Sequence, residues 1–97
     1  MANIKSAIKR ARQAKVRTLR NRIRKTRIKT AVKKFEAALE AKDIEAAREA
    51  LRQAMKAVDV AAAKGAIHKN AADRRKSRLS KKLSKLIAEQ AAQGAAE

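Results

Sequence analysis

The sequence contains no cysteine and no proline, only two glycines, and a single aromatic residue, Phe35. Without cysteine the chain forms neither disulfides nor zinc–thiolate sites, and its redox compartment stays open. Without proline, and with no glycine before Gly65, nothing of that kind interrupts a helix in the first 64 residues. The lack of tryptophan and tyrosine argues against a membrane-surface helix and against stacking on single-stranded bases.

Residues for catalysis are also scarce. His68 is the only histidine, and a metal site there would lack a second His or Cys ligand. Most carboxylates lie in the middle of the chain beside Lys and Arg, where ion pairs one helical turn apart account for them, although Asp59 has no obvious partner. We therefore predict a protein that is not an enzyme and that uses no cofactor, metal or small-molecule substrate.

Long apolar runs are missing too. None approaches the ~18 residues of a transmembrane helix. The N-terminus also lacks the apolar core of a secretion signal, so we expect neither a membrane partner nor export. A transit peptide would share the Arg-rich, acid-poor start and remains an alternative, although here the basic run continues directly into the apolar pattern of the core.

Acidic residues are absent from residues 1–34, which carry 14 Lys or Arg. The whole chain has a net charge of +18, with a second basic block over residues 64–85 and a nearly neutral segment between the two blocks. A chain of 97 residues cannot neutralise this charge internally, so a polyanion outside it must do so.

Apolar residues recur at spacings of three and four along the whole chain, and no segment alternates with a period of two. This pattern predicts an all-α fold, a three-helix bundle with a long basic first helix. We expect Phe35 to fill the centre of the core, facing Leu51, Met55 and Leu83. The three core stripes are Ile28, Ala31, Val32, Phe35, Ala38 and Leu39; then Ile44, Ala47, Leu51, Ala54, Met55, Val58 and Ala62; then Ile67, Ala72, Leu79, Leu83 and Leu86.

Two helix boundaries are predicted. Gly65 is a good stop after the second helix, because glycine adopts the left-handed conformation without a Cβ clash. The first break rests on Asp43 as an N-cap, with Glu45 favourable in the following turn. Since neither Gly nor Pro marks this break, a single helix over residues 4–64 is the alternative.

The predicted bundle covers only part of the chain. Upstream of Ile28 the apolar residues Val16, Leu19 and Ile23 point roughly 140° away from the core stripe. We predict one domain over residues 1–97, divided into three parts. These are a basic helical extension (1–25) that frays or is disordered without RNA because its like charges repel, the bundle (26–87), and a frayed tail (88–97).

The second basic block begins where a helix should start. Free backbone N–H groups around His68 favour an anion there. His68 itself either contacts a phosphate or base, or is an exposed residue without a role. Arg and Lys side chains are suited to the phosphates of a folded RNA. An architectural DNA-binding protein would usually have apolar wedge residues or a dimer surface, so RNA is favoured over DNA. From charge and position we predict RNA contacts from Lys5, Lys9, Arg10, Arg12, Lys15, Arg17, Arg20, Asn21, Arg22, Arg24, Lys25, Arg27, Lys29, Lys64, Gly65, His68, Lys69, Asn70, Arg74, Arg75, Lys76, Ser77 and Arg78.

Three stretches resemble a known family. Met1-Ala2-Asn3-Ile4-Lys5-Ser6-Ala7, Ala63-Lys64-Gly65-Ala66-Ile67-His68-Lys69-Asn70 and Arg75-Lys76-Ser77-Arg78-Leu79 are similar to segments of bacterial small-subunit ribosomal protein twenty. The resemblance implies direct binding to small-subunit ribosomal RNA early in assembly. It adds contacts from Asn3 and Ser6 to those above. Ile8, Asp73 and the Ala/Gln-rich tail from Glu89 to Glu97 depart from the family pattern.

These observations predict a structural ribosomal protein of the cytoplasm. Its partners would be small-subunit ribosomal RNA and the small ribosomal subunit, within which it is a monomer. It would neutralise phosphates where RNA helices pack closely. A histone-like or nucleoid DNA-binding protein is the alternative, and a cationic amphipathic membrane binder is a third class.

Overall fold

The computed structural model describes residues 2–96, so that Met1 and Glu97, the two ends of the predicted domain, lie outside the described residues. Three helices, α1 (Ala2–Glu40), α2 (Ile44–Ala63) and α3 (Lys69–Ala96), make up this part of the chain, which contains no strand. The prediction of an all-α bundle with a long basic first helix is confirmed.

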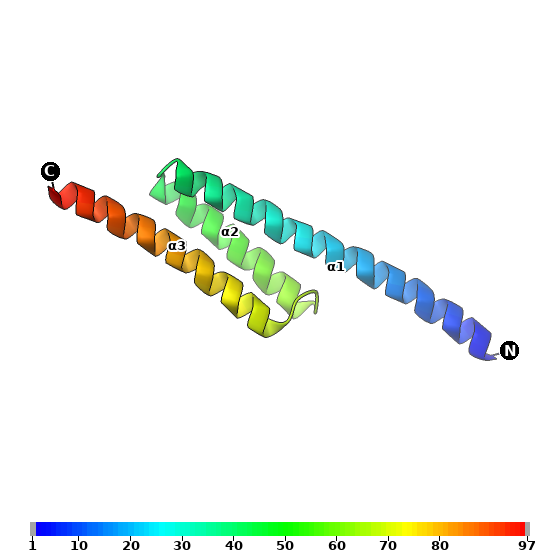
Figure 1. Cartoon of the computed structure of the whole chain (residues 1–97). Helices are drawn as coiled ribbons and strands as arrows, with labels where there is room; N and C mark the ends of the chain where they lie inside the picture. The colour runs from blue at the N-terminus through cyan, green and yellow to red at the C-terminus, as the bar shows by residue number, and fades with distance from the viewer. Residues whose placement is uncertain (1, 97) are drawn as a thin grey trace.

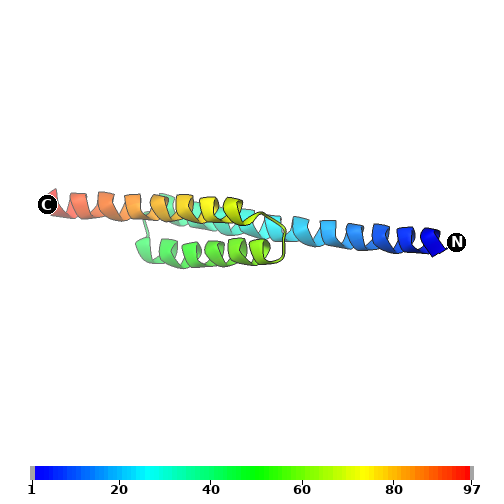
Figure 2. The same ribbon diagram turned by 90° about the horizontal axis from the view of Figure 1, so that it is seen from below.

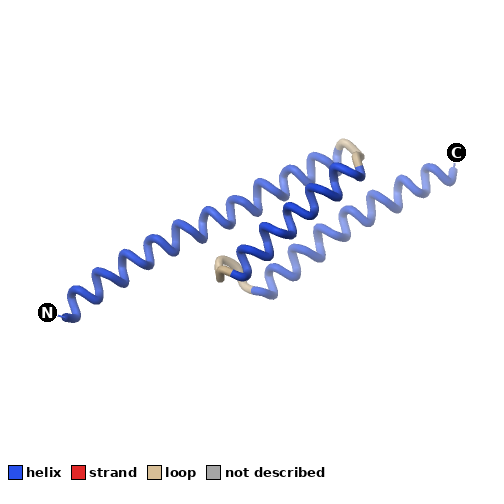
Figure 3. Tube along the Cα trace, turned by 180° about the vertical axis from the view of Figure 1, so that it is seen from behind, coloured by secondary structure: helices blue, strands red, loops and turns tan. Residues whose placement is uncertain are grey.

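The molecule is a rod of 79 × 21 × 13 Å. Successive helices run antiparallel and overlap only in the middle of the rod, where they form the bundle (Figure 1). The N-terminal half of α1 leaves one end of the bundle and the C-terminal end of α3 leaves the other (Figure 2). The two connections are short and lie at opposite ends of the bundle (Figure 3).

Helix α1 runs unbroken for 39 residues. Its residues are largely Ala, Lys, Arg and other good helix formers, with no Gly or Pro to interrupt the backbone hydrogen bonds. The hydroxyl groups of Thr18, Thr26 and Thr30 each donate to the carbonyl oxygen four residues earlier, which satisfies them within the helix. We call residues 2–24 the arm, because no described side chain in this range is buried.

The turn between α1 and α2 ends the first helix without glycine. Lys42 adopts a left-handed conformation with φ 57°. The N–H of Lys42 donates to the Leu39 carbonyl, and that of Asp43 to the Ala38 carbonyl, which is the Schellman pattern. The Asp43 carboxylate then caps α2 by accepting from the Ala46 N–H at 3.2 Å. The predicted cap is confirmed, and the alternative of one helix over residues 4–64 is wrong.

Replacing Lys42 by glycine is expected to stabilise the bundle by about 0.5–1 kcal/mol. A left-handed Lys costs about 1–2 kcal/mol of backbone strain, which the greater freedom of glycine in the unfolded chain offsets in part. Thermal unfolding followed by circular dichroism should show a midpoint higher by a few degrees. Lys42→Ala is the control, because it removes the same charge and keeps the strain. An equal rise of the midpoint in Lys42→Ala would show that the added stability comes from the loss of charge and not from relief of strain.

The turn between α2 and α3 uses glycine in the same position. Gly65 has φ +78° and donates to the Ala62 carbonyl, while Ala66 donates to the Ala61 carbonyl. Ala61 and Ala66 also pack together in one apolar cluster, which completes the Schellman motif. The predicted stop at Gly65 is confirmed.

The core consists of two neighbouring apolar clusters. Phe35 is fully buried in the first, and Ile28, 1% exposed, lies in the second. Small residues on α2 lie against both, so the other two helices can approach it closely. The first cluster joins all three helices and contains Phe35, Ala47, Ala54, Leu79 and Leu83; the second contains Ile28, Val58, Ala61 and Ala72.

Leu51 and Leu83 pack in the cluster of Phe35, as predicted. Met55 does not, since it is half-buried and belongs to neither cluster. The neighbouring Ala54 faces the core, and a residue one position along a helix points about 100° away. The prediction that Met55 contacts Phe35 is therefore wrong.

Beyond the bundle, α3 continues as a helix through the segment predicted to fray. The Gln90 side-chain amide donates to the Lys42 carbonyl at 2.8 Å, which ties this segment to the turn between α1 and α2. Closer to the centre, Lys82 pairs with Glu36 across α3 and α1 at 3.3 Å. Fraying beyond Gln90 stays a prediction. Over residues 2–96, no helix is both long enough and apolar enough to cross a membrane.

Candidate nucleic-acid interface

The arm carries nine Lys or Arg residues and no acid. The ion pairs that form in the described part of the chain all lie at Glu36 or beyond, so none of them neutralises an arm cation. Arg10, Arg17 and Arg24 repeat every seven residues, which places them in a row on the side of α1 that carries Phe35 into the core. The arm therefore extends the bundle as a cationic rod.

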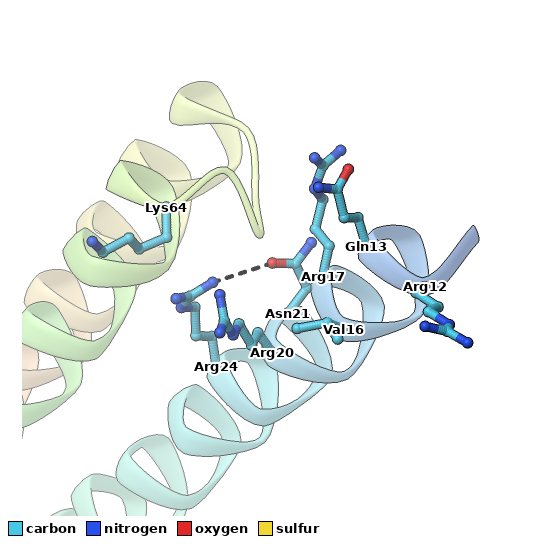
Figure 4. Close-up of a pocket in the computed structure, with 8 residues that line it drawn as sticks. All are labelled: Arg12, Gln13, Val16, Arg17, Arg20, Asn21, Arg24 and Lys64. Atoms are coloured by element: carbon cyan, nitrogen blue, oxygen red, sulfur yellow. Dashed lines mark hydrogen bonds between the residues drawn. The ribbon is translucent and has the colours of Figure 1, made fainter. Parts of the chain in front are cut away.

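A hollow of about 630 Å³ lies where the arm meets the end of α2 (Figure 4). Lys64, the C-cap of α2, lines it from the bundle. On the arm side, the Arg24 guanidinium donates to the Asn21 side-chain oxygen at 3.4 Å. Gln13 also lines the hollow, one turn before Arg17; it was not predicted because it carries no charge to mark it in the sequence. The lining residues are Arg12, Gln13, Val16, Arg17, Arg20, Asn21, Arg24 and Lys64.

A second hollow, of about 370 Å³, joins the two basic blocks. Lys25 and Lys29 line it from α1, while His68 and Arg75 line it from the start of α3. Ile28, Ala66, Ile67 and Ala71 form the rest of its wall. Cations nearly fifty residues apart in sequence therefore surround one concave surface, because the antiparallel turn at Gly65 returns the chain to α1.

His68 has a structural role that the sequence analysis did not foresee. Its Nδ1 accepts from the Asn70 backbone N–H at 3.1 Å, and its carbonyl accepts from the Ala72 N–H. His68 is thus the N-cap of α3. With Nδ1 turned to this backbone bond, the Nε2 side of the ring is left free to donate to an oxygen outside the protein.

Lys76 has a partner inside the protein. Its Nζ lies 2.8 Å from Oδ1 of Asp59, and this bond joins α3 to α2. The hydrogen bond and charge of Asp59 raise the pKa of Lys76 above its usual value. Asp59, which had no obvious partner in the sequence, is therefore paired with Lys76. A contact between Lys76 and an external phosphate would have to compete with that carboxylate.

The remaining predicted residues lie on the surfaces of α1, α3 and the turn between α2 and α3. Nearly all are exposed; Asn21, Arg24 and Lys76 are half-buried. Those not placed above are Asn3, Lys5, Ser6, Lys9, Lys15, Arg22 and Arg27 on α1, Gly65 in the turn, and Lys69, Asn70, Arg74, Ser77 and Arg78 on α3.

This arrangement suits an extended polyanion. Guanidinium and ammonium groups on a rod bind phosphates at many points, and the fixed helix gives them a regular spacing. The described residues also contain no group of three His, Asp or Glu that could hold a metal ion. Fold and surface together define a basic helical protein of the kind that binds the phosphate backbone of a nucleic acid.

Comparison with known proteins identifies the family. The model of ribosomal protein S20 matches residues 2–84. Small ribosomal subunit protein bS20 of Geobacillus kaustophilus (strain HTA426) is 58% identical over 88 residues, which are 91% of this chain and 99% of that protein. Small ribosomal subunit protein bS20 of Heliobacterium modesticaldum (strain ATCC 51547 / Ice1) is 52% identical over 87 residues, which are 90% of this chain and 99% of that protein. The chain belongs to the ribosomal protein S20 family.

Proposed function

We propose that this protein is a structural component of the small ribosomal subunit, that it binds the ribosomal RNA of that subunit directly, and that it does so as a monomer. Its cations neutralise phosphates where RNA helices pack closely, and so stabilise that packing during assembly. Membership of the S20 family supports the ribosomal role. The relatives give no support to a nucleoid DNA-binding role.

The observation that carries the RNA-binding mechanism is the second hollow. It presents cations from α1 and α3 to one concave surface, lined by Lys25, Lys29, His68 and Arg75. A convex phosphate backbone fits a concave cationic surface, and several phosphates can be bound there together. The predicted contacts of the arm extend the same surface along the RNA.

Replacing Lys29 and Arg75 by glutamine is expected to weaken binding to refolded small-subunit ribosomal RNA about tenfold or more, because two phosphate contacts are lost. The dependence of log K on log salt should become shallower by about 1.4–1.8, since each contact contributes about 0.7–0.9. Filter binding over a range of salt concentrations measures both quantities.

The matched control replaces Arg48 and Arg52, two exposed cations on α2 outside both hollows, by glutamine. It removes the same charge and should change affinity by no more than about twofold. Equal losses in the two variants would show that net charge alone drives binding and that the hollow has no special part in it.

A further inference from the structure

The arm has a second surface on the side opposite its arginine row. Five of the six large apolar side chains exposed in the described part of the chain lie there, each 44–61% exposed. At about 100° per residue, their positions fall within an arc of roughly 120°. This arc points away from the side on which Ile28 and Phe35 enter the core. We call this set the apolar stripe, and it comprises Ile4, Ile8, Val16, Leu19 and Ile23.

The bundle does not cover the stripe. At the hollow of Lys64, where the arm meets the end of α2, Val16 is the one stripe residue in the lining. At the other end of the stripe, Ile23 lines a groove between α1 and α2 beside Ala50. Ile4, Ile8 and Leu19 line neither the hollow nor the groove. Several exposed Ile, Leu and Val side chains on one helix face are a feature of interaction surfaces.

Cations border the stripe and also interrupt it. Lys9 and Arg20 follow one edge, and Arg22 and, just inside the arc, Lys15 follow the other. Lys5 and Arg12 project within the arc. A hydrocarbon layer or an apolar protein face would have to desolvate Arg12 without a partner, which is costly. A second copy of the chain would bring nine more arm cations and no arm acid, so the two arms would repel.

A sugar–phosphate surface matches this pattern. The minor groove of an A-form RNA duplex is wide and shallow, and it exposes riboses between two rows of phosphates. Apolar side chains can pack on the riboses while Lys and Arg at the edges reach the phosphates on both sides. The stripe runs for about 28 Å along the helix, so the contact would extend over several base pairs.

We propose that the apolar stripe packs on the riboses of a minor groove in small-subunit ribosomal RNA, with the bordering cations on the phosphates of both strands. This inference rests on the proposed function and deepens it, because it assigns one face of the arm to one groove of the RNA. The arm would then recognise the shape of the duplex and its riboses, and not the base sequence.

Replacing Ile4, Ile8 and Leu19 by alanine tests the proposal. The triple variant removes apolar surface and no charge, and alanine favours helix at each position. Affinity for refolded full-length small-subunit ribosomal RNA should fall at least about tenfold, while the salt dependence of log K stays unchanged. Replacing Arg10 and Arg17 by glutamine should instead make that salt dependence shallower by about 1.4–1.8.

Val60→Ala on α2 is the control for the triple variant. Val60 is the remaining large apolar side chain exposed in the described residues, at 40%, and it lies outside the stripe. Its loss should change affinity by no more than about twofold. Hydroxyl-radical cleavage, which attacks riboses from the minor groove, should show a protected tract with the wild-type protein and none with the triple variant.

The outcomes separate this inference from the proposed function. A wild-type protein that does not bind the RNA refutes the proposed function itself. A wild type that binds, with a triple variant of equal affinity and equal ribose protection, refutes the stripe alone. The stripe proposal also fails if the triple variant keeps its RNA affinity but loses binding to phosphatidylglycerol vesicles, or loses a dimer seen by sedimentation in the wild type. Those results would assign the stripe to a bilayer or to a second copy.

Discussion

Replacing Phe35 by alanine is expected to unfold the RNA-free bundle at room temperature. Phe35 is 0% exposed and packs against Leu79 and Leu83 in the cluster that joins all three helices. Deleting a buried Phe ring costs about 3–5 kcal/mol, through lost transfer free energy and the cavity left behind. A bundle of this size has a total stability of about the same magnitude.

Circular dichroism melting, with and without ribosomal RNA, measures this effect. RNA should partly restore the helical signal, because a ligand that binds only the folded form stabilises that form by mass action. For the melt without RNA, Ile8→Ala is the matched control, since Ile8 is a large apolar residue of the same helix but is exposed. A free Phe35→Ala protein that melts cooperatively within a few degrees of the wild type would contradict the assigned role of Phe35.

Affinity for ribosomal RNA is expected to fall steeply with salt. If eight of the cations engage phosphates, each contributes about −0.7 to −0.9 to the slope of log K against log salt, and the slope is about −6 or steeper. Between 50 and 200 mM salt the affinity would then fall by three to four orders of magnitude. Filter binding at five or six salt concentrations gives the slope directly.

Salt acts on the protein as well as on the complex, so melting of the free protein over the same salt range is the control. Screening should relieve repulsion among the arm cations and leave the free protein no less folded. The loss of affinity then belongs to the release of counterions from the RNA. A slope shallower than about −3 would exclude phosphate neutralisation as the main source of affinity.

The sequence predicted the helices better than the residues that end them. Spacings of three and four identify a buried face because the helix period is fixed, so Ile28, Phe35 and Leu83 were assigned to the core correctly. Asp43 and Gly65 were found because their chemistry is typical of caps. The left-handed Lys42 could not be found in that way, since lysine has no preference for this conformation. Only the docking of α2 on α1 requires it.

In the candidate site, too, some features could be predicted from the sequence and others could not. Charge counts along the chain reveal two basic blocks, and these can be counted without a structure. Contacts between helices cannot be predicted in this way, because they depend on how the helices are rotated against each other. Lys76 was therefore assigned to RNA although Asp59, seventeen residues earlier, lies 2.8 Å from it. His68 was assigned to a phosphate or base for want of any signal that its ring would cap α3.

The continuity of α1 has a consequence for how the arm becomes ordered. Starting a helix is costly, whereas extending an existing one adds a hydrogen bond for each residue fixed. The packed segment around Ile28 and Phe35 is such an existing helix, and the arm extends it without a break towards the N-terminus. The hydrophobic core therefore acts as the nucleus of the arm. A change in core packing, made several turns away from any phosphate, alters the fraction of molecules whose arm is already helical when RNA arrives.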